Sequence, residues 1–149
     1  MRRMGARKQH GVASVEFAIL LVPLVLMIFG ITELGRAIYQ YNTLVKATRN
    51  AARYKSMTGV SQGEAETRCL AVTGDTACAG PPLLDGLTVN MVSIDYANNV
   101  ATGSGGINLV KVTINDPGAA ERFGFVSVVP FVIPDITFGP VATTMRGPA

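Results

Sequence analysis

Histidine, tryptophan, cysteine and charge are all scarce in this chain of 149 residues. Tryptophan is absent, cysteine occurs twice, and His10 is the only histidine. A Ser-His-Asp triad and a Cys-His pair each need a histidine, so a single one near the N-terminus argues against both kinds of catalysis. Charged residues make up 15% of the chain and hydrophobic residues 48%, a balance that excludes a disordered polyelectrolyte.

Neither metal binding nor carboxylate catalysis has a clear pattern in the sequence. Four soft or imidazole ligands for zinc are not available, and no calcium loop of the Asp-x-Asp-x-Asp-Gly type occurs. The acidic residues are scattered and mostly adjoin turn residues. A carboxylate-pair hydrolase and an irregular cation site at Asp95, Asn98 and Asn99 stay open as alternatives. We predict that the chain is not an enzyme and needs no cofactor or metal.

The few charges are unevenly distributed along the chain. Residues 1–11 contain no acidic residue and four basic ones, namely Arg2, Arg3, Arg7 and Lys8. The formal net charge is +3, so residues 12–149, with nine basic and ten acidic residues, sum to −1. The basicity therefore belongs to a short leader. Because no Phe, Tyr or Trp lies among these bases, we expect them to act as topology signals rather than to bind nucleic acid.

A long apolar run follows the leader. Residues 12–31 carry a single charge, Glu16. At about 1.5 Å per residue, a helix of this length spans roughly 30 Å, the thickness of a bilayer core. A buried core helix is disfavoured, since the remaining chain is too small to surround it. A cleaved signal peptide is disfavoured because its apolar region would be shorter and followed by small residues. The basic leader predicts a cytoplasmic N-terminus and an exported C-terminal part.

The helical pattern continues beyond the apolar run. A mostly apolar stripe with heptad spacing is formed by Ile31, Leu34, Ile38, Tyr41, Val45, Thr48 and Ala52. We predict one helix over roughly residues 13–56, in which residues 32–56 form an amphipathic stem outside the membrane. The stripe is expected to pack on the protein's own domain. Packing against neighbouring subunits is the alternative, and the two can hold in different segments of the stripe.

The segment around the start of the apolar run resembles the processing site of type IV prepilins and pseudopilins. Residues 7–17 read RKQHGVASVEF, with a short basic leader, Gly11 before the cut, and Glu16 at the fifth mature position. The continuation includes GITELGR at residues 30–36 and AARY at residues 51–54. With these motifs the chain resembles the TadE-like family of the tight-adherence (Tad/Flp) pilus systems.

This resemblance implies cleavage by a prepilin peptidase between Gly11 and Val12. The new amine on Val12 would lie four residues from Glu16 on the same helical face. A carboxylate in an apolar segment costs about 2.5–3.5 kcal/mol at a helix centre, so pairing with that amine, in the same or a neighbouring subunit, would stabilise it. The resemblance thus implies a role in helix assembly for Glu16 and the adjoining Phe17. A solvated carboxylate without a partner is the alternative.

The function implied by the resemblance is that of a minor pseudopilin supporting assembly of Tad/Flp adherence pili. Its partners would be the bacterial inner membrane, the prepilin peptidase, and other pilins and pseudopilins of the Tad system. The N-terminus would be cytoplasmic and the C-terminal domain periplasmic, with later incorporation into an extracellular pilus. The alternative is an uncleaved, single-pass envelope protein that acts as a scaffold of the secretion or pilus machinery.

Residues 57–149 are expected to form an exported, β-rich domain that contains both cysteines. In an oxidising compartment we predict a disulfide between Cys69 and Cys78, with two free thiols as the alternative. A short helix over residues 64–70 would lead into the closed loop. The ring is small, so the chain-entropy model gives a stabilisation of about 2–3 kcal/mol.

The rest of the chain reads as strands and turns. Residues 87–96 and 107–115 are expected to pair across a polar hairpin loop that starts at Asn98-Asn99. Residues 123–133 are expected to be a loop or short element that packs on the stem. A last strand, residues 136–146, would be interrupted by Gly139-Pro140 and lie at an edge. The predicted fold class is α+β: a long N-terminal transmembrane helix whose stem packs on a small antiparallel sheet, as in pilins.

Overall fold

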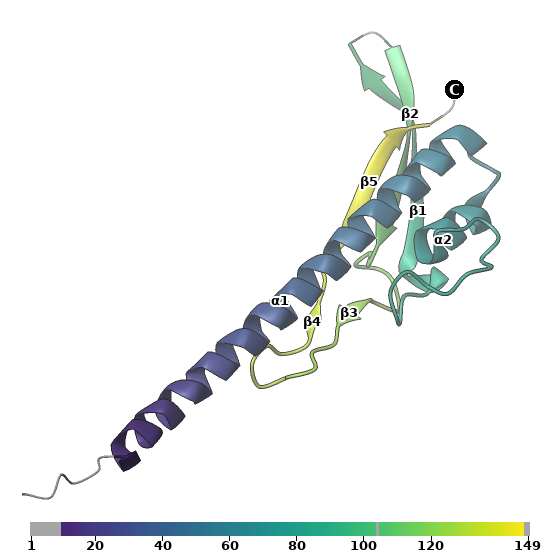
Figure 1. Cartoon of the computed structure of the whole chain (residues 1–149). Helices are drawn as coiled ribbons and strands as arrows, with labels where there is room; N and C mark the ends of the chain where they lie inside the picture. The colour runs from purple at the N-terminus through teal and green to yellow at the C-terminus, as the bar shows by residue number, and fades with distance from the viewer. Residues whose placement is uncertain (1–9, 104, 148–149) are drawn as a thin grey trace, which may run out of the picture.

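A single long helix organises the structure. The computed structural model describes residues 10–103 and 105–147, so most of the predicted leader lies outside the described residues. Helix α1 (His10–Thr58) has 49 residues and continues through Pro23. Its first half projects alone, and the rest of the chain packs against its second half (Figure 1). The helix predicted over residues 13–56 is confirmed.

The projecting half of α1 is apolar and exposed along its length. Every residue from 11 to 29 is exposed, and Gly30 is the first that is half-buried. Within the described part of the chain, α1 is the one helix long and apolar enough to cross a membrane. Pro23 lacks the N–H that would bond to the carbonyl four residues earlier, a loss that membrane helices tolerate. The segment fits membrane anchoring through the predicted span, residues 12–31.

The stem buries a different face from the predicted one. Ile31, Leu34 and Ile38 are 52–66% exposed, whereas Thr48 and Ala52, from the same predicted stripe, are buried. The buried face is built mainly from small or polar residues: Glu33, Ala37, Leu44, Ala47, Thr48, Ala51, Ala52 and Lys55. Alanines let the sheet approach α1 closely, and the two buried charges find partners in loops. The predicted packing of the stripe on the domain is therefore wrong for its membrane-proximal half.

A three-stranded antiparallel sheet covers the buried face of α1. Its strand order is β1 (Val92–Thr102), β2 (Gly105–Ile114) and β5 (Val141–Arg146). In the register, Val112 of β2 lies opposite Ile94 on one side and Thr143 on the other. Val112, Ile114 and Val141 join Leu44, Ala47 and Ala51 of α1 in one core cluster. The predicted α+β class is confirmed, with β5 at an edge of the sheet.

The first hairpin differs in detail from the prediction. Residues 89–91 form a short 3-10 helix, η1 (Val89–Met91), so β1 begins at Val92 rather than at residue 87. The strand then passes through Asn98-Asn99, where the register shifts, and continues to Thr102. Asn99 has φ 54°, and its N–H donates to Asn108 Oδ1 at 3.0 Å. The two asparagines therefore make a bulge inside the strand, not the start of the loop.

The expected last strand is divided between two sheets. Residues Ile136–Thr137 form β4, which pairs with β3 (Gly124–Phe125) in a separate two-stranded sheet. Only Val141–Arg146 joins β2. Gly139-Pro140 falls between the two parts, since proline supplies no N–H for a continuing ladder. Phe123 and Phe125 are buried, and Arg36 of α1 lies over the Phe125 ring, in line with the expected packing on the stem, but Val126, Val128 and Phe131 are exposed.

Asn115 joins the two sheets. It follows β2, is 1% exposed and has φ 64°. Its Nδ2 donates to the carbonyls of Phe123 at 2.8 Å and Phe138 at 3.2 Å, and its Oδ1 accepts the Phe123 N–H at 2.7 Å. One side chain thereby holds the chain before β3 and the chain after β4 against the end of β2.

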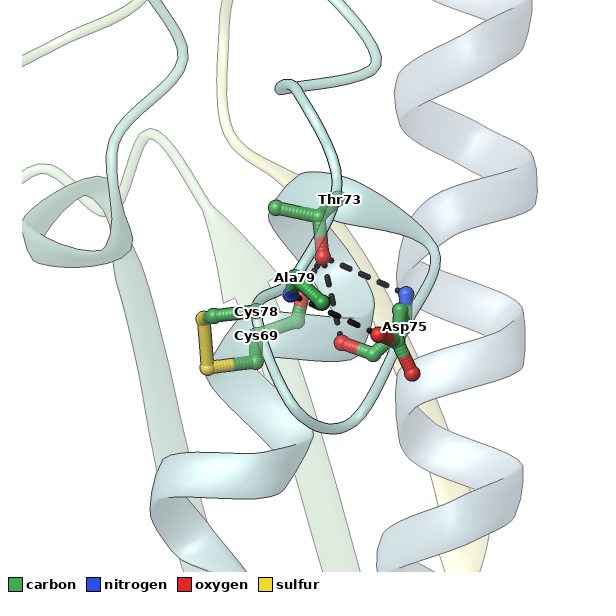
Figure 2. The surroundings of a disulfide bond; sticks show 5 residues. All are labelled: Cys69, Thr73, Asp75, Cys78 and Ala79. Atoms are coloured by element: carbon green, nitrogen blue, oxygen red, sulfur yellow. Dashed lines mark hydrogen bonds between the residues drawn. A yellow bond between two sulfur atoms is a disulfide. The ribbon is translucent and has the colours of Figure 1, made fainter.

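Helix α2 (Glu64–Thr73) packs on α1 and carries the predicted disulfide. Cys69 and Cys78 are bonded, with a Cα–Cα distance of 4.9 Å (Figure 2). The loop between them is closed further by Thr73, whose Oγ1 accepts the Asp75 N–H at 3.2 Å. Gly74 ends the helix at φ 78°, a conformation that favours glycine, and its N–H donates to the Leu70 carbonyl. The helix predicted over residues 64–70 is confirmed and runs one turn further.

Replacing both cysteines by serine should lower the free energy of unfolding by about 2–3 kcal/mol, because the unfolded chain regains the freedom of the open loop. The measurement is urea denaturation of the full chain in detergent, followed by circular dichroism. Reduction of the unaltered chain with dithiothreitol is the matched control and should give the same loss. Equal stability of the oxidised, reduced and double-serine chains would contradict this prediction.

Candidate functional site

The predicted cleavage site lies in the first turn of α1. Gly11 and Val12 are its second and third residues, and Val12 is 60% exposed. A Cβ placed on Gly11 would meet no atom within 4 Å, so nothing among the described residues shields this bond. A peptidase that takes an extended chain must first unwind the turn. Glycine eases that step, since it is about 1 kcal/mol less favourable than alanine within a helix.

Glu16 and Phe17 lie on the exposed segment directly after this bond. Phe17 is 65% exposed, and Glu16 is also exposed. Glu16 follows Val12 by four residues, which places both on one helical face. The one salt bridge among the described residues joins Arg36 to Glu33, so Glu16 has no ion-pair partner there. The geometry leaves its carboxylate free to meet an amine on Val12 or on an adjacent helix.

Glu33 anchors the membrane-proximal end of the stem. It is 4% exposed, and Arg36 Nη1 lies 3.0 Å from its Oε1. Glu33 Oε2 also accepts from the Ser127 hydroxyl and the Val128 N–H, each at 3.3 Å. Arg36 in turn lies over the ring of Phe125 at 5.4 Å. The sequence prediction gave neither Glu33 nor Arg36 a structural role, although opposite charges three residues apart on a helix are typical of an ion pair.

Lys55 closes the other end of the stem. It is 1% exposed, and its Nζ donates to the carbonyls of Gly59, Val60 and Gln62 just beyond α1. The ammonium also lies 5.4 Å from the centroid of the Tyr96 ring. These contacts bind carbonyls of the loop that follows α1 and fix the turn into α2. The sequence prediction did not identify this role.

Tyr96, the ring that Lys55 contacts, has a raised pKa. Its hydroxyl donates to Glu64 Oε1 at 3.0 Å. Burial of the phenol, followed by this hydrogen bond and by the charge of Glu64, raises the pKa of Tyr96 from 10.0 to about 12, and Arg68 opposes the shift. Because the bond needs the neutral phenol, its contribution to stability is complete below pH 10.0 and is lost as the pH rises through about 12. It links α2 to β1.

The described residues show no arrangement typical of metal binding or nucleophilic catalysis. Residues 10–103 and 105–147 contain no group of three or more His, Cys, Asp or Glu side chains that could hold an ion. The alternative cation site consisted of Asp95, Asn98 and Asn99. Its two asparagines form the bulge of β1. Both cysteines are used in the disulfide. The residues that combine exposure with unusual chemistry are instead those of the first two turns of α1.

Comparison with known proteins identifies this N-terminal segment. Residues 11–53 match the family model described as TadE-like protein. The match begins at the predicted cleavage site, includes Glu16 and extends through most of the stem, although it covers less than a third of the chain. Comparisons with curated proteins and with solved structures gave no match. Over residues 11–53 the chain is similar to TadE-like proteins, in agreement with the resemblance seen in its sequence.

Proposed function

We propose that the chain is a minor pseudopilin that supports assembly of Tad/Flp adherence pili. One observation carries the proposal: the first part of the TadE-like segment is an apolar helix, exposed from residue 11 to residue 29, whose single carboxylate is the fifth residue after the predicted cleavage point. An isolated membrane anchor has no need of a charge at this depth, since a charge there costs free energy. A helix that must dock against other helices with a free N-terminal amine does need such a charge, as the partner of that amine.

In this proposal a prepilin peptidase cuts between Gly11 and Val12 and removes the basic leader. The ammonium of Val12 then pairs with Glu16 of the same or a neighbouring subunit, which neutralises both charges in a medium of low dielectric constant. The chain sits in the bacterial inner membrane with its N-terminus in the cytoplasm and its disulfide-containing domain in the periplasm. A periplasmic domain is consistent with the Cys69–Cys78 bond, because disulfides persist in oxidising compartments.

The exposed half of the stem stripe supports a role in assembly. Ile31, Leu34 and Ile38 continue the apolar surface of the membrane segment outward and are 52–66% exposed. Tyr41 extends the same surface and is 48% exposed. A row of large apolar side chains on one helix face suits packing against helices of other pilins and pseudopilins. This role was the alternative reading of the stripe, and we now favour it for its membrane-proximal half.

Mass spectrometry of the protein isolated from membranes tests the processing step. We expect a mature chain that begins at Val12. Gly11→Leu should leave the precursor uncut, because a bulky side chain opposes the extended conformation that the peptidase needs. Gly5→Leu is the matched control and should still yield Val12. An intact leader, in cells that process their other pilins, would overturn the proposal and favour an uncleaved scaffold.

A further inference from the structure

The loop between β3 and β4, residues 126–135, lies against α1 at the end of its membrane segment. A Cβ placed on Gly30 would lie 3.6 Å from Val132 Cγ1. Glu33, one turn further along α1, accepts hydrogen bonds from Ser127 and Val128 at 3.3 Å. Figure 1 shows this loop extending along α1 beyond the sheet, toward the projecting half of the helix. The loop is therefore held at a fixed level on the helix axis.

That level coincides with the outer boundary of the predicted membrane span. The apolar run ends at Ile31, and Gly30 precedes it. Since residues 12–31 match the hydrocarbon thickness at about 1.5 Å per residue, a group beside Gly30 lies at the edge of the hydrocarbon layer. The ion pair of Glu33 and Arg36 then lies just outside, among the lipid headgroups.

The loop has the composition and exposure of a lipid contact. Residues 126–134 read VSVVPFVIP and contain no charged residue, and Asp135 ends the loop. Val126, Val128 and Phe131 are 68%, 71% and 78% exposed. Phe131 is the most exposed large hydrophobic residue in the described part of the chain. Water would solvate these side chains poorly, whereas the adjoining bilayer offers an apolar medium without any movement of the loop.

Backbone hydrogen bonds within the loop make such a contact feasible. The Val132 N–H donates to the Val129 carbonyl at 2.9 Å, and the Val129 N–H donates to the Ser127 hydroxyl at 3.1 Å. The Ser127 N–H donates to Asp135 Oδ1 at 2.8 Å. Pro130 and Pro134 have no N–H to satisfy. Most backbone donors of the loop thus have a partner, either within the loop or, for Val128, on Glu33, which lowers the cost of leaving water.

We propose that the β3–β4 loop inserts Val126, Val128 and Phe131 into the outer face of the bilayer that α1 crosses. The inference rests on the membrane anchoring in the proposed function, but it does not require cleavage or pilus assembly. The occupant is the lipid surface itself, because the patch is continuous with the lipid-facing helix and lies at the level of the boundary. The loop has no basic residue, so a neutral phosphatidylcholine surface suffices.

The absence of tryptophan in the chain makes a direct test possible. Phe131→Trp and Val128→Trp each place a single fluorophore on the loop of the full chain, reconstituted into phosphatidylcholine vesicles with or without brominated acyl chains. Phe29→Trp, in the membrane segment, is the positive control. Met57→Trp is the negative control, because Met57 lies at the far end of α1 and is 70% exposed. We expect bromolipid to reduce the emission of both loop reporters at least roughly twofold, as for interfacial side chains.

Each outcome bears on a different part of the inference. Quenching of Phe29→Trp without quenching of either loop reporter would overturn the loop contact while leaving the anchor intact. A blue-shifted but unquenched loop reporter would show that a protein surface, such as a second copy, covers the patch, and would also overturn it. If Phe29→Trp itself were not quenched, the anchor and the loop contact would both be wrong. A chain that is never cleaved should still show the expected quenching.

Discussion

Replacing Asn115 by alanine should lower the free energy of unfolding by about 3–5 kcal/mol, the largest loss that we expect from one substitution in the domain. Three hydrogen bonds of the buried amide would disappear, leaving the carbonyls of Phe123 and Phe138 and the N–H of Phe123 without this partner. Alanine would also have to adopt φ near 64°, which costs roughly another 1 kcal/mol. Urea denaturation in detergent, followed by circular dichroism, measures the loss.

Two further variants separate the causes of this loss. Asn115→Gly removes the hydrogen bonds but tolerates the positive φ, so it should be about 1 kcal/mol more stable than Asn115→Ala. Asn90→Ala is the matched control, because Asn90 is exposed, and it should change the stability by less than about 0.5 kcal/mol. A loss below about 1 kcal/mol for Asn115→Ala would show that the two sheets do not depend on this side chain.

Replacing Glu16 by alanine should reduce the number of pili at least roughly tenfold while leaving cleavage after Gly11 intact. An unpaired Val12 ammonium within the apolar layer costs about 2.5–3.5 kcal/mol, and tenfold corresponds to only about 1.4 kcal/mol. Electron microscopy counts the pili, and mass spectrometry of the membrane fraction checks the cleavage.

The charge, rather than the size, of Glu16 is the expected cause. Glu16→Gln should therefore lose as much as Glu16→Ala, whereas Glu16→Asp should retain part of the function. Glu66→Ala, which removes an exposed carboxylate from α2, is the matched control and should be neutral. Normal pilus numbers in a correctly cleaved Glu16→Ala strain would remove the proposed role of this residue in assembly.

Features encoded by neighbouring residues were predictable from the sequence. The apolar run and heptad spacing gave α1, because helix and membrane propensities depend on residues within a few turns. The bond between Cys69 and Cys78 was predictable because only one pairing exists in the chain. The proposed processing residues Gly11, Val12 and Glu16 likewise lie within two turns of one helix. Their exposure to solvent could be seen only in the structure.

Features that depend on distant residues were not predictable. Glu33 is buried because Ser127 and Val128, more than ninety residues later, supply donors to its carboxylate. The hydrophobic pattern does not identify a buried glutamate. It therefore assigned the buried face of the stem to larger apolar residues. Likewise, residues 136–146 looked like one interrupted strand. Asn115, which bonds to the carbonyl of Phe138, separates its two parts.

The continuity of α1 has a mechanical consequence. The helix passes without a break from His10 to the buried turns around Ala51, a distance of roughly 60 Å at 1.5 Å per residue. Axial force applied to the N-terminal end would reach the domain through the ladder of backbone hydrogen bonds, without a flexible joint to absorb it. Pro23 omits one rung of that ladder. Under tension the helix should therefore yield first at Pro23, inside the predicted membrane span, where one backbone hydrogen bond is missing.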